Sequence, residues 1–498
     1  MNFLTQNGEL IVFCAYLLFM IGIGVYFFLR SKSGGDKGYF LGGRQMGPWV
    51  SALSAGASDM SAWVLMGLPA SIYAAGIGQS WIAIGLGIGY TLSWLVEAPR
   101  LRRYSIAAND SITIPQYLTN RFLSSNRALQ VICAVIFLVA YTVYAASSIK
   151  ACGTLFNTVM GIDATLAMYL AAVIIILYTF LGGFSAVCWT DFFQGLLMLG
   201  ALLIAPIFAL GIINSGEGAM TMGQLPDDYW NLFANWKDIV SGLGWGLGYF
   251  GMPHIIIRFM SLRSDKDLKK SAKIGITWTV LILTFSVLAG IVGHLLLGEI
   301  ADSSTVFIQM VRKLFPFALV SGLILSAILA AAMSTADSQL LASSSAFSVD
   351  VYKPIIRKNK ASEKEMLWSG RFVVLAISVI AVLIAANPNS GTIMDLVENA
   401  WGVFGAAFGP AIMLSLFWRR FNFAGAVAGI VTGAAVDIAW LIVFNKMVVV
   451  ESLSGIYEII PGFVASLIVA IVVTLVTKAP SKQVTDIFDK VAKNEIGE

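Results

Sequence analysis

Three polar residues, Ser58, Asp59 and Ser61, interrupt an apolar stretch that runs from residue 51 to residue 70. The stretch is long enough to cross a bilayer, where an acid at mid-depth costs roughly 2.5–3.5 kcal/mol. Small residues such as Gly56 hold a helix weakly. We therefore predict a helix broken at its centre, because unwound backbone at membrane depth is tolerated only inside protein or around a cavity. The alternative is an intact helix whose Asp59 packs against a neighbour.

A second group of polar side chains lies in residues 331–339, which have the sequence Ala-Ala-Met-Ser-Thr-Ala-Asp-Ser-Gln. Ser334 and Ser338 are four residues apart and share a helix face, with Thr335 beside Ser334. A hard alkali cation prefers oxygen ligands, so these hydroxyls and the freed carbonyls of the first stretch would suit it. The alternative is that the hydroxyls bond back to carbonyls of their own helix.

Residues 242–253 contain five glycines, two large aromatic residues and a proline, Pro253. Proline inside a helix removes a hydrogen bond, and glycine next to it favours a kink. We predict a second broken helix here, with Trp245 and Tyr249 near the break. The alternative is a glycine face that lets two continuous helices pack closely.

These segments must be positioned by membrane-spanning helices, because 58% of the 498 residues are hydrophobic and only 12% are charged. This composition predicts an all-α polytopic membrane protein and gives no reason to expect a nucleic-acid partner. Thirteen apolar runs of about 20 residues are present. They begin near residues 10, 48, 79, 128, 164, 192, 238, 274, 316, 368, 396, 423 and 457.

The basic residues fix the expected orientation. With thirteen spans, 27 of the 32 Lys and Arg residues fall in loops or flanks that share one side. The positive-inside rule then places the N-terminus outside and the C-terminus inside. The two broken helices are five spans apart, an odd number, so two such units in tandem would cross in opposite senses, as in inverted-repeat transporters.

This reasoning divides the chain into five parts. They are an N-terminal helix and cytoplasmic loop (1–47), a first repeat of spans 2–6 (48–213), a second repeat of spans 7–11 (237–418), two peripheral spans (419–477) and a polar cytoplasmic tail too short to be a domain (478–498).

Other residues are given ordinary roles. Asp191 precedes the sixth apolar run and is interpreted as a helix cap. Lys150 and Asp437 lie outside the predicted site, and the sequence assigns them no function. The chain has only two histidines, which argues against histidine-based metal catalysis. Four cysteines form no C-x-x-C pair and are predicted to be small buried side chains rather than disulfides or metal ligands: Cys14, Cys133, Cys152 and Cys188.

Several short runs together resemble the sodium:solute symporter family, and the match extends over essentially the whole chain. The runs lie at 41–44 (Leu-Gly-Gly-Arg), 54–61, 183–184, 189–191, 245–253 and 332–335. They are most similar to the proline-transporting branch of that family. The resemblance implies a leucine-transporter-type (LeuT-like) fold of thirteen helices with a five-plus-five inverted repeat. It also implies import of L-proline coupled to sodium influx, by alternating access across the bacterial cytoplasmic membrane, and no enzyme activity.

The resemblance also implies roles for particular residues. Sodium would be held by the side chains of Ser334 and Thr335 and by the carbonyls of Ala57, Met60 and Ala331. The imino acid would contact Ser61, Tyr144, Trp245, Tyr249 and Pro253. Ion-path or gating roles would fall to Arg44 at the cytoplasmic gate, and to Asp59, Trp63, Asp191, Asp337 and Ser338. Asp337 departs from the family pattern and leaves open a second cation or proton site with Asp191 and Ser338, and Ala62 stands where glycine is frequent.

Three alternatives remain. The first is a sodium symporter for another small solute such as pantothenate, a sugar or sialic acid, against which the aromatic residues of 242–253 argue. The second is a sensor built on a transporter core, which would need a larger cytoplasmic domain than the tail provides. The third is a membrane-embedded enzyme, but no H-E-x-x-H motif or P-loop is present. No obligate protein partner is expected.

Overall fold

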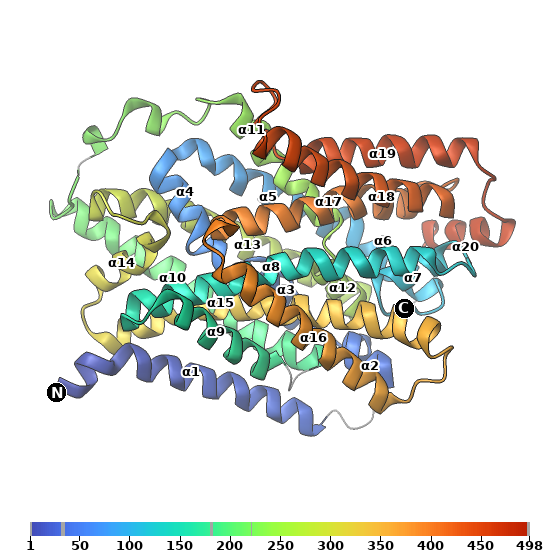
Figure 1. Ribbon diagram of the computed structural model, residues 1–498, viewed down its shortest axis with the longest axis horizontal. Coiled ribbons are helices and arrows are strands. Elements are labelled where there is room, and N and C mark those ends of the chain that lie inside the picture. Colours follow the sequence, from blue (N-terminus) through green and yellow to red (C-terminus); the bar gives the residue numbers. More distant parts are fainter. Residues whose placement is uncertain (1, 31–34, 180–182, 221, 496–498) are drawn as a thin grey trace.

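The computed structural model describes residues 2–30, 35–179, 183–220 and 222–495. Within these ranges every regular element is a helix and none is a strand. The long helices lie side by side along one direction, with α1 (Asn2–Arg30) starting at the left-hand end and α20 (Lys482–Ala492) at the right-hand end (Figure 1). The predicted all-α class is confirmed.

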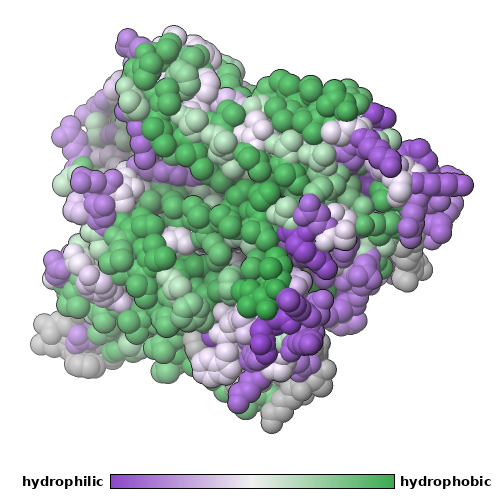
Figure 2. Space-filling model, turned by 45° about the vertical axis from the view of Figure 1, so that its right-hand side comes forward, coloured by the Kyte–Doolittle hydropathy of each residue, from purple (hydrophilic) through white to green (hydrophobic). Residues whose placement is uncertain are grey.

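Ten helices of the described residues are long and apolar enough to cross a membrane. Three of them include π-helical segments, and in one of these α5 (Ser80–Leu92) continues through such a segment into α6 (Ala98–Ala107). Besides α1, the others are α8 (Ala128–Met160), α10 (Phe184–Asn214), α13 (Asp265–Leu297), α15 (Ala318–Ser345), α16 (Glu363–Ala386), α17 (Ile393–Phe417), α18 (Phe423–Trp440) and α19 (Ile459–Val476). The shorter α9 (Ala164–Thr179) is also apolar. Figure 2 shows an apolar band across the middle of one face, with hydrophilic residues gathered at its edges, as a bilayer requires.

Both predicted helix breaks are confirmed. The first separates α3 (Pro48–Asp59) from α4 (Gly67–Ala75), with one short 3₁₀ turn between them. The second separates α11 (Trp236–Trp245) from α12 (Pro253–Ser261), again through a 3₁₀ turn. The alternative of an intact first helix is therefore wrong. Because α12 packs against α3, the half after one break lies beside the half before the other.

α15 lies at the centre of the molecule, where it packs against α1, α3, α8 and α10. Almost every residue from Ser321 to Ser345 is buried, so this helix meets protein on all sides. Many of these residues are alanine or serine, and small side chains let helix backbones approach closely. The hydroxyl-bearing segment of α15 is thereby held directly against α3.

One expectation about a smaller feature is corrected. Cys14 lies on an exposed face of α1, whereas the other three cysteines are buried free thiols. The polar tail forms a short helix, α20, which buries Val484, Phe488 and Val491 against α6. Its apolar residues recur at helical spacing, which gives the short helix one face to dock.

Candidate functional site

The first break frees one backbone carbonyl at the centre of the molecule. In a continuous helix the amide of Ser61 would donate to the carbonyl of Ala57, but here it donates to Asp59 O at 2.9 Å. The change comes at Met60 and Ser61, whose backbone angles leave the helical region. Ala57 O is thus available to groups from another helix.

That carbonyl meets the hydroxyl pair of α15. The Ser334 hydroxyl lies 2.8 Å from Ala57 O and 3.1 Å from Ala331 O, and the Thr335 hydroxyl lies 3.5 Å from Ala57 O. All four residues are fully buried. The hydrogen bond from the Ser334 hydroxyl to Ala331 O stays within α15, as the alternative interpretation expected. The same hydroxyl also contacts Ala57 O of α3, so both interpretations apply to this cluster of oxygens. Within the described chain, no hydrogen bond joins the Met60 carbonyl to this cluster. Four neutral oxygens in a dry site are suitable ligands for a monovalent hard cation.

The second break carries a wall of aromatic rings. The Trp245 ring centre lies 6.4 Å from that of Trp63, 6.2 Å from Trp401 and 5.0 Å from Tyr457. Trp401 also donates from its indole nitrogen to Trp245 O at 2.9 Å. Gly248 lets the Trp401 ring lie directly against the backbone. These side chains form an apolar surface beside the first break.

Asp59 connects the two breaks. The Tyr249 hydroxyl donates to Asp59 Oδ2 at 2.6 Å, while Asp59 O accepts from the Trp63 indole at 3.3 Å and from Tyr144 at 3.5 Å. Among the described residues, Asp59 Oδ1 has no hydrogen-bond partner. The carboxylate therefore has one oxygen available to a bound cation or polar ligand, and the other ties the second broken helix to the first. Ser61 lies beside this contact and Pro253 starts α12, both buried.

The glycines of the second break have a further role. Gly242 and Gly246 lie against Gly85 and Gly89 of α5, so closely that a side chain at either contact would overlap backbone. The alternative of a glycine packing face is therefore true as well, although the helix is interrupted. Close packing and interruption use the same residue type for different reasons.

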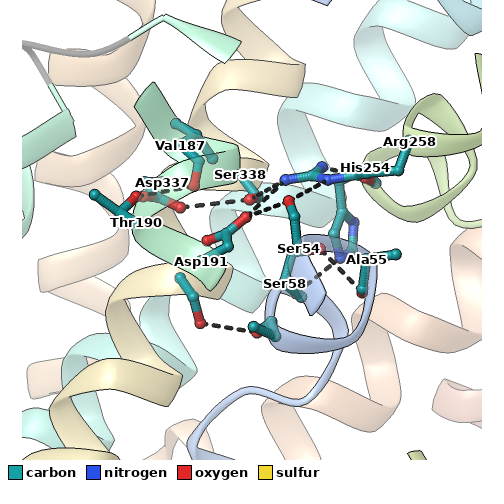
Figure 3. A network of polar contacts seen from close by, with 12 residues as sticks. Ser54, Ala55, Ser58, Val187, Thr190, Asp191, His254, Arg258, Asp337 and Ser338 are labelled. Carbon is teal, nitrogen blue, oxygen red and sulfur yellow. Dashed lines mark hydrogen bonds and ion pairs between the residues drawn. The ribbon is translucent and has the colours of Figure 1, made fainter. Parts of the chain in front are cut away.

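A buried ionic network lies one turn beyond the oxygen cluster (Figure 3). Arg258 of α12 donates to Asp191 Oδ2 at 3.2 Å, to the Ser338 hydroxyl at 2.6 Å and to the Ser54 hydroxyl at 3.1 Å. Ser54 in turn donates to Asp191 Oδ2 at 2.6 Å. The guanidinium also contacts the carbonyl of His254. Arg258 therefore joins α12, α3, α10 and α15 in one place.

This network corrects the interpretation of Asp191. The helix begins at Phe184, so Asp191 lies two turns inside α10 and does not cap it. The structure does bring Asp191 and Ser338 together, through Arg258, and Ser338 lies 3.4 Å from Asp337 Oδ1. In the sequence, Arg258 was only one of the 27 basic residues that share one side. The signal for a structural role was its position in an apolar run, four residues after His254.

Arg44 forms a second network at the end of the bundle that carries α2 (Gly35–Leu41) and α6. Its guanidinium donates to Met260 O at 2.6 Å, to Ser111 O at 2.8 Å and to Asp110 Oδ1 at 2.9 Å. Burial alone would raise the pKa of Asp110, but the hydrogen bond from Lys37 and the charge of Arg44 hold it below its usual value. Arg44 thereby fastens the end of α12 to the turn after α6, which suits the predicted gate.

The comparisons with known proteins are consistent with this geometry. The sequence profile of the sodium:solute symporter family matches residues 39–433. The chain belongs to the sodium:solute symporter family. Its helices, its two interruptions and the oxygen cluster between them are the features that such a transporter needs, and family membership makes the protein a transporter rather than an enzyme.

Two relatives match nearly the whole chain. The osmoregulated proline transporter OpuE of Bacillus subtilis is 43% identical, with 96% of each chain covered. Sodium/proline symporter 2 of Staphylococcus saprophyticus is also 43% identical, over 97% of this chain and 95% of its own. The protein is thus a multi-pass protein of the bacterial cytoplasmic membrane.

A solved structure shares the fold. It is a Na⁺-coupled sialic acid symporter in a substrate-bound outward-open state, with a TM-score of 0.77, 21% identity, and coverage of 95% of this chain and 99% of that chain. The architecture is therefore the LeuT-like one that the resemblance implied.

Proposed function

We propose that the protein imports L-proline together with sodium by alternating access. The observation that carries this proposal is the meeting of the freed Ala57 carbonyl with the hydroxyls of Ser334 and Thr335, beside an aromatic wall. Relatives named for sodium/proline symport, 43% identical over nearly the full length, support the choice of substrate. Family membership supports sodium as the coupling ion.

Sodium would bind among the carbonyls of Ala57, Met60 and Ala331 and the hydroxyls of Ser334 and Thr335. In the state described, the Ser334 hydroxyl donates to Ala57 O and Ala331 O. When a cation binds, the hydroxyls would turn their lone pairs toward it, because a hydroxyl serves as donor or acceptor by rotation. A negative charge on Asp59, two residues after Ala57, would favour the ion electrostatically.

Proline would bind beside this ion. Its ring is apolar and would lie against Trp245 and Tyr249, whereas its carboxylate suits the positive N-terminal end of a half-helix. The polar groups of Ser61 and Tyr144 would complete the pocket, with Pro253 at the start of α12. All five side chains are buried in the state described. Because the site is closed from both ends in this state, either end of the molecule could open to it while the other end stays closed.

The driving force is adequate for nutrient uptake. One sodium ion that crosses about 100 mV releases about 2.3 kcal/mol. A tenfold sodium gradient adds about 1.4 kcal/mol. One-to-one coupling would therefore accumulate proline several hundred-fold.

We further propose thirteen membrane spans, with the N-terminus outside and the C-terminus inside. The three spans beyond the ten long apolar helices would be the two interrupted ones, α3–α4 and α11–α12, and α9. Residues 48–213 and 237–418 would be the inverted repeats, with 1–47, 419–477 and 478–498 outside them. Packing of α12 against α3 supports opposite directions for the two repeats.

Arg44 and Arg258 would then lie on the cytoplasmic side and close it in this state. Asp191, Asp337 and Ser338 would form an inward ion path, or a second cation site, once Arg258 withdraws. The contact of Arg258 with both Asp191 and Ser338 supports this, because the same oxygens serve either the guanidinium or a cation. Trp63, hydrogen-bonded to Asp59 O, would move with the first break.

Uptake of labelled proline into proteoliposomes, with sodium and proton gradients imposed separately, tests the proposal. Thr335→Val should raise the sodium concentration for half-maximal uptake, because it removes one ligand oxygen and keeps the side-chain shape. The matched control is Ser326→Ala on the same helix, whose hydroxyl donates only within α15, to Gly322 O. Uptake driven by protons alone, or an unchanged sodium dependence in Thr335→Val, would contradict the proposed ion site.

A further inference from the structure

Asp437 of α18 is a buried acid for which the transport site has no use. Its side chain is fully inaccessible, and neither carboxylate oxygen lies within hydrogen-bonding distance of any described residue. An ionised carboxylate without a partner is very costly in a low-dielectric interior, so such a group is either neutral or bound to a ligand. The sequence assigned no role to this residue.

Two further acids lie beside Asp437. Its Oδ1 lies 2.8 Å from the point where a Cβ on Gly402 would be, and the Glu458 side chain approaches the same point to 3.4 Å. Glu458 is buried at the start of α19, and its Oε1 also has no partner within the described chain. Glu398 of α17 carries a third carboxyl group and lines the same cavity as Glu458. Carboxylates that share a poorly hydrated region repel one another, so ionising all three is unfavourable.

A cavity of about 340 Å³ reaches this cluster from the surface. Glu398, Glu458 and Asn445 line it, with the exposed Lys446 and Asp395 at its rim. Asn445 donates to Glu458 Oε2 at 3.0 Å, whereas the buried Oε1 has no hydrogen-bond donor among the described residues. Water that enters such a polar cavity can carry protons to and from the acids.

The ionisable groups that act on Asp437 come from α17 and α19, the two helices that pack most extensively against α18. They are Glu398 on α17, and Tyr457 and Glu458 at the start of α19. None of them is basic. Nowhere in the described ranges do three acidic, histidine or cysteine side chains converge in the way that a metal ion requires. A proton needs only one carboxyl group, so it is the ligand that this arrangement suits.

The cluster also touches the wall of the transport site. The Tyr457 hydroxyl donates to Glu398 O at 2.9 Å, and the Tyr457 ring lies 5.0 Å from the Trp245 ring. A change in charge at Glu458, the next residue, would therefore reach Trp245 through one side chain. Loss of a proton would add repulsion where α17, α18 and α19 meet.

We propose that Asp437, with Glu398 and Glu458, forms a proton-binding site separate from the sodium site, and that loss of its proton weakens substrate binding by loosening Tyr457 against Trp245. The effect on substrate rests on the proposed function; the proton site itself does not. Asp437→Asn should imitate the protonated form, because it is neutral and has the same shape.

Infrared difference spectroscopy of the full-length protein in lipid nanodiscs tests the site directly. Between about pH 5 and about pH 9, a range in which an ordinary carboxyl group is largely ionised, the wild-type protein should lose the C=O band of a protonated carboxylic acid. Asp437→Asn should show a smaller change. The control is Asp267→Asn, which should keep the whole change, because Asp267 forms an ion pair with Arg263 and stays ionised over this range.

A band of undiminished size in Asp437→Asn, or one that sodium chloride removes at constant pH, would overturn the proposal. Glu458→Gln gives a second test if Asp437→Asn does not fold. The substitution removes the repulsion between the carboxylates of Glu458 and Asp437, so the band should be lost at lower pH. An unshifted band would count against the site. Proline affinity should fall at alkaline pH in the wild-type protein and stay constant in Asp437→Asn. Absence of proline binding at any pH would contradict the proposed function but leave the infrared test standing.

Discussion

The hydroxyl of Ser338 is a small group whose removal should change how often the Arg258 end of the molecule opens. It accepts from Arg258 Nη2 at 2.6 Å in the network that joins α12 to α15. A hydrogen bond to a charged group contributes about 1.5–3 kcal/mol. Ser338→Ala should therefore raise the open fraction of this end by about 10- to about 150-fold relative to the closed arrangement.

A native thiol reports this opening. Cys188 is fully buried and lies beside Ser54 and Arg258, so a maleimide reaches it only when the network separates. In a parent protein that retains Cys188, the other three cysteines are replaced by alanine. The rate of maleimide labelling, measured without sodium, should increase in Ser338→Ala by the factor given above.

Ser326→Ala is the matched control, because it removes a buried hydroxyl from the same helix without touching Arg258. Its labelling rate should equal that of the parent. An unchanged rate in Ser338→Ala would refute the role of this hydrogen bond in closure. An equal increase in both variants would show that α15 had loosened as a whole, and would refute the specific argument.

The other predictions concern the pocket wall, a packing contact and an ion pair. Trp245→Ala should weaken proline affinity while the protein still reaches the membrane, and normal binding would place the pocket elsewhere. Gly248→Ala should lower thermal stability by about 1–3 kcal/mol or more, because its new methyl group overlaps the Trp401 ring; Gly200→Ala, with open space at its Cβ, should not. The pKa of Asp110 is below its usual value, so its stabilising effect is present above the unfolded pKa of about 3.9 and is lost as pH falls through the lower folded value. Melting temperature should therefore fall more steeply on acidification in the wild-type protein than in Asp110→Asn, and parallel curves would contradict this.

Gly56 illustrates how a correct prediction can rest on an incomplete reason. The sequence suggested that this glycine weakens the helix. In the structure Gly56 stays helical, and a Cβ there would lie 2.5 Å from the Trp278 ring, so its small size serves packing. The break comes four residues later, at Met60 and Ser61. The composition of residues 51–70 indicated correctly that the helix is interrupted. The role of an individual small residue such as Gly56, however, depends on the neighbouring helix that packs against it.

Asp191 and Arg258 show a different limit. From the local sequence, Asp191 was interpreted as a helix cap, and Arg258 was only one of the basic residues on the side predicted to be cytoplasmic. Each interpretation uses only residues nearby in the chain, whereas their contact joins positions 67 residues apart. A charge buried in a membrane protein is stabilised by the partner that the fold brings to it, and that partner does not show in the local sequence.

The sequence alone determined the all-helical membrane class, the two interrupted helices and the family, because hydrophobic length and buried polar residues are local properties. Tertiary structure alone decided that the Ala57 carbonyl faces Ser334, that Arg258 closes over Asp191, and that Asp437 lies beside Glu458. These are contacts between helices, and they depend on the rotation and depth of each helix against its neighbours. Helix packing fixes both quantities, and the hydropathy of any one segment does not.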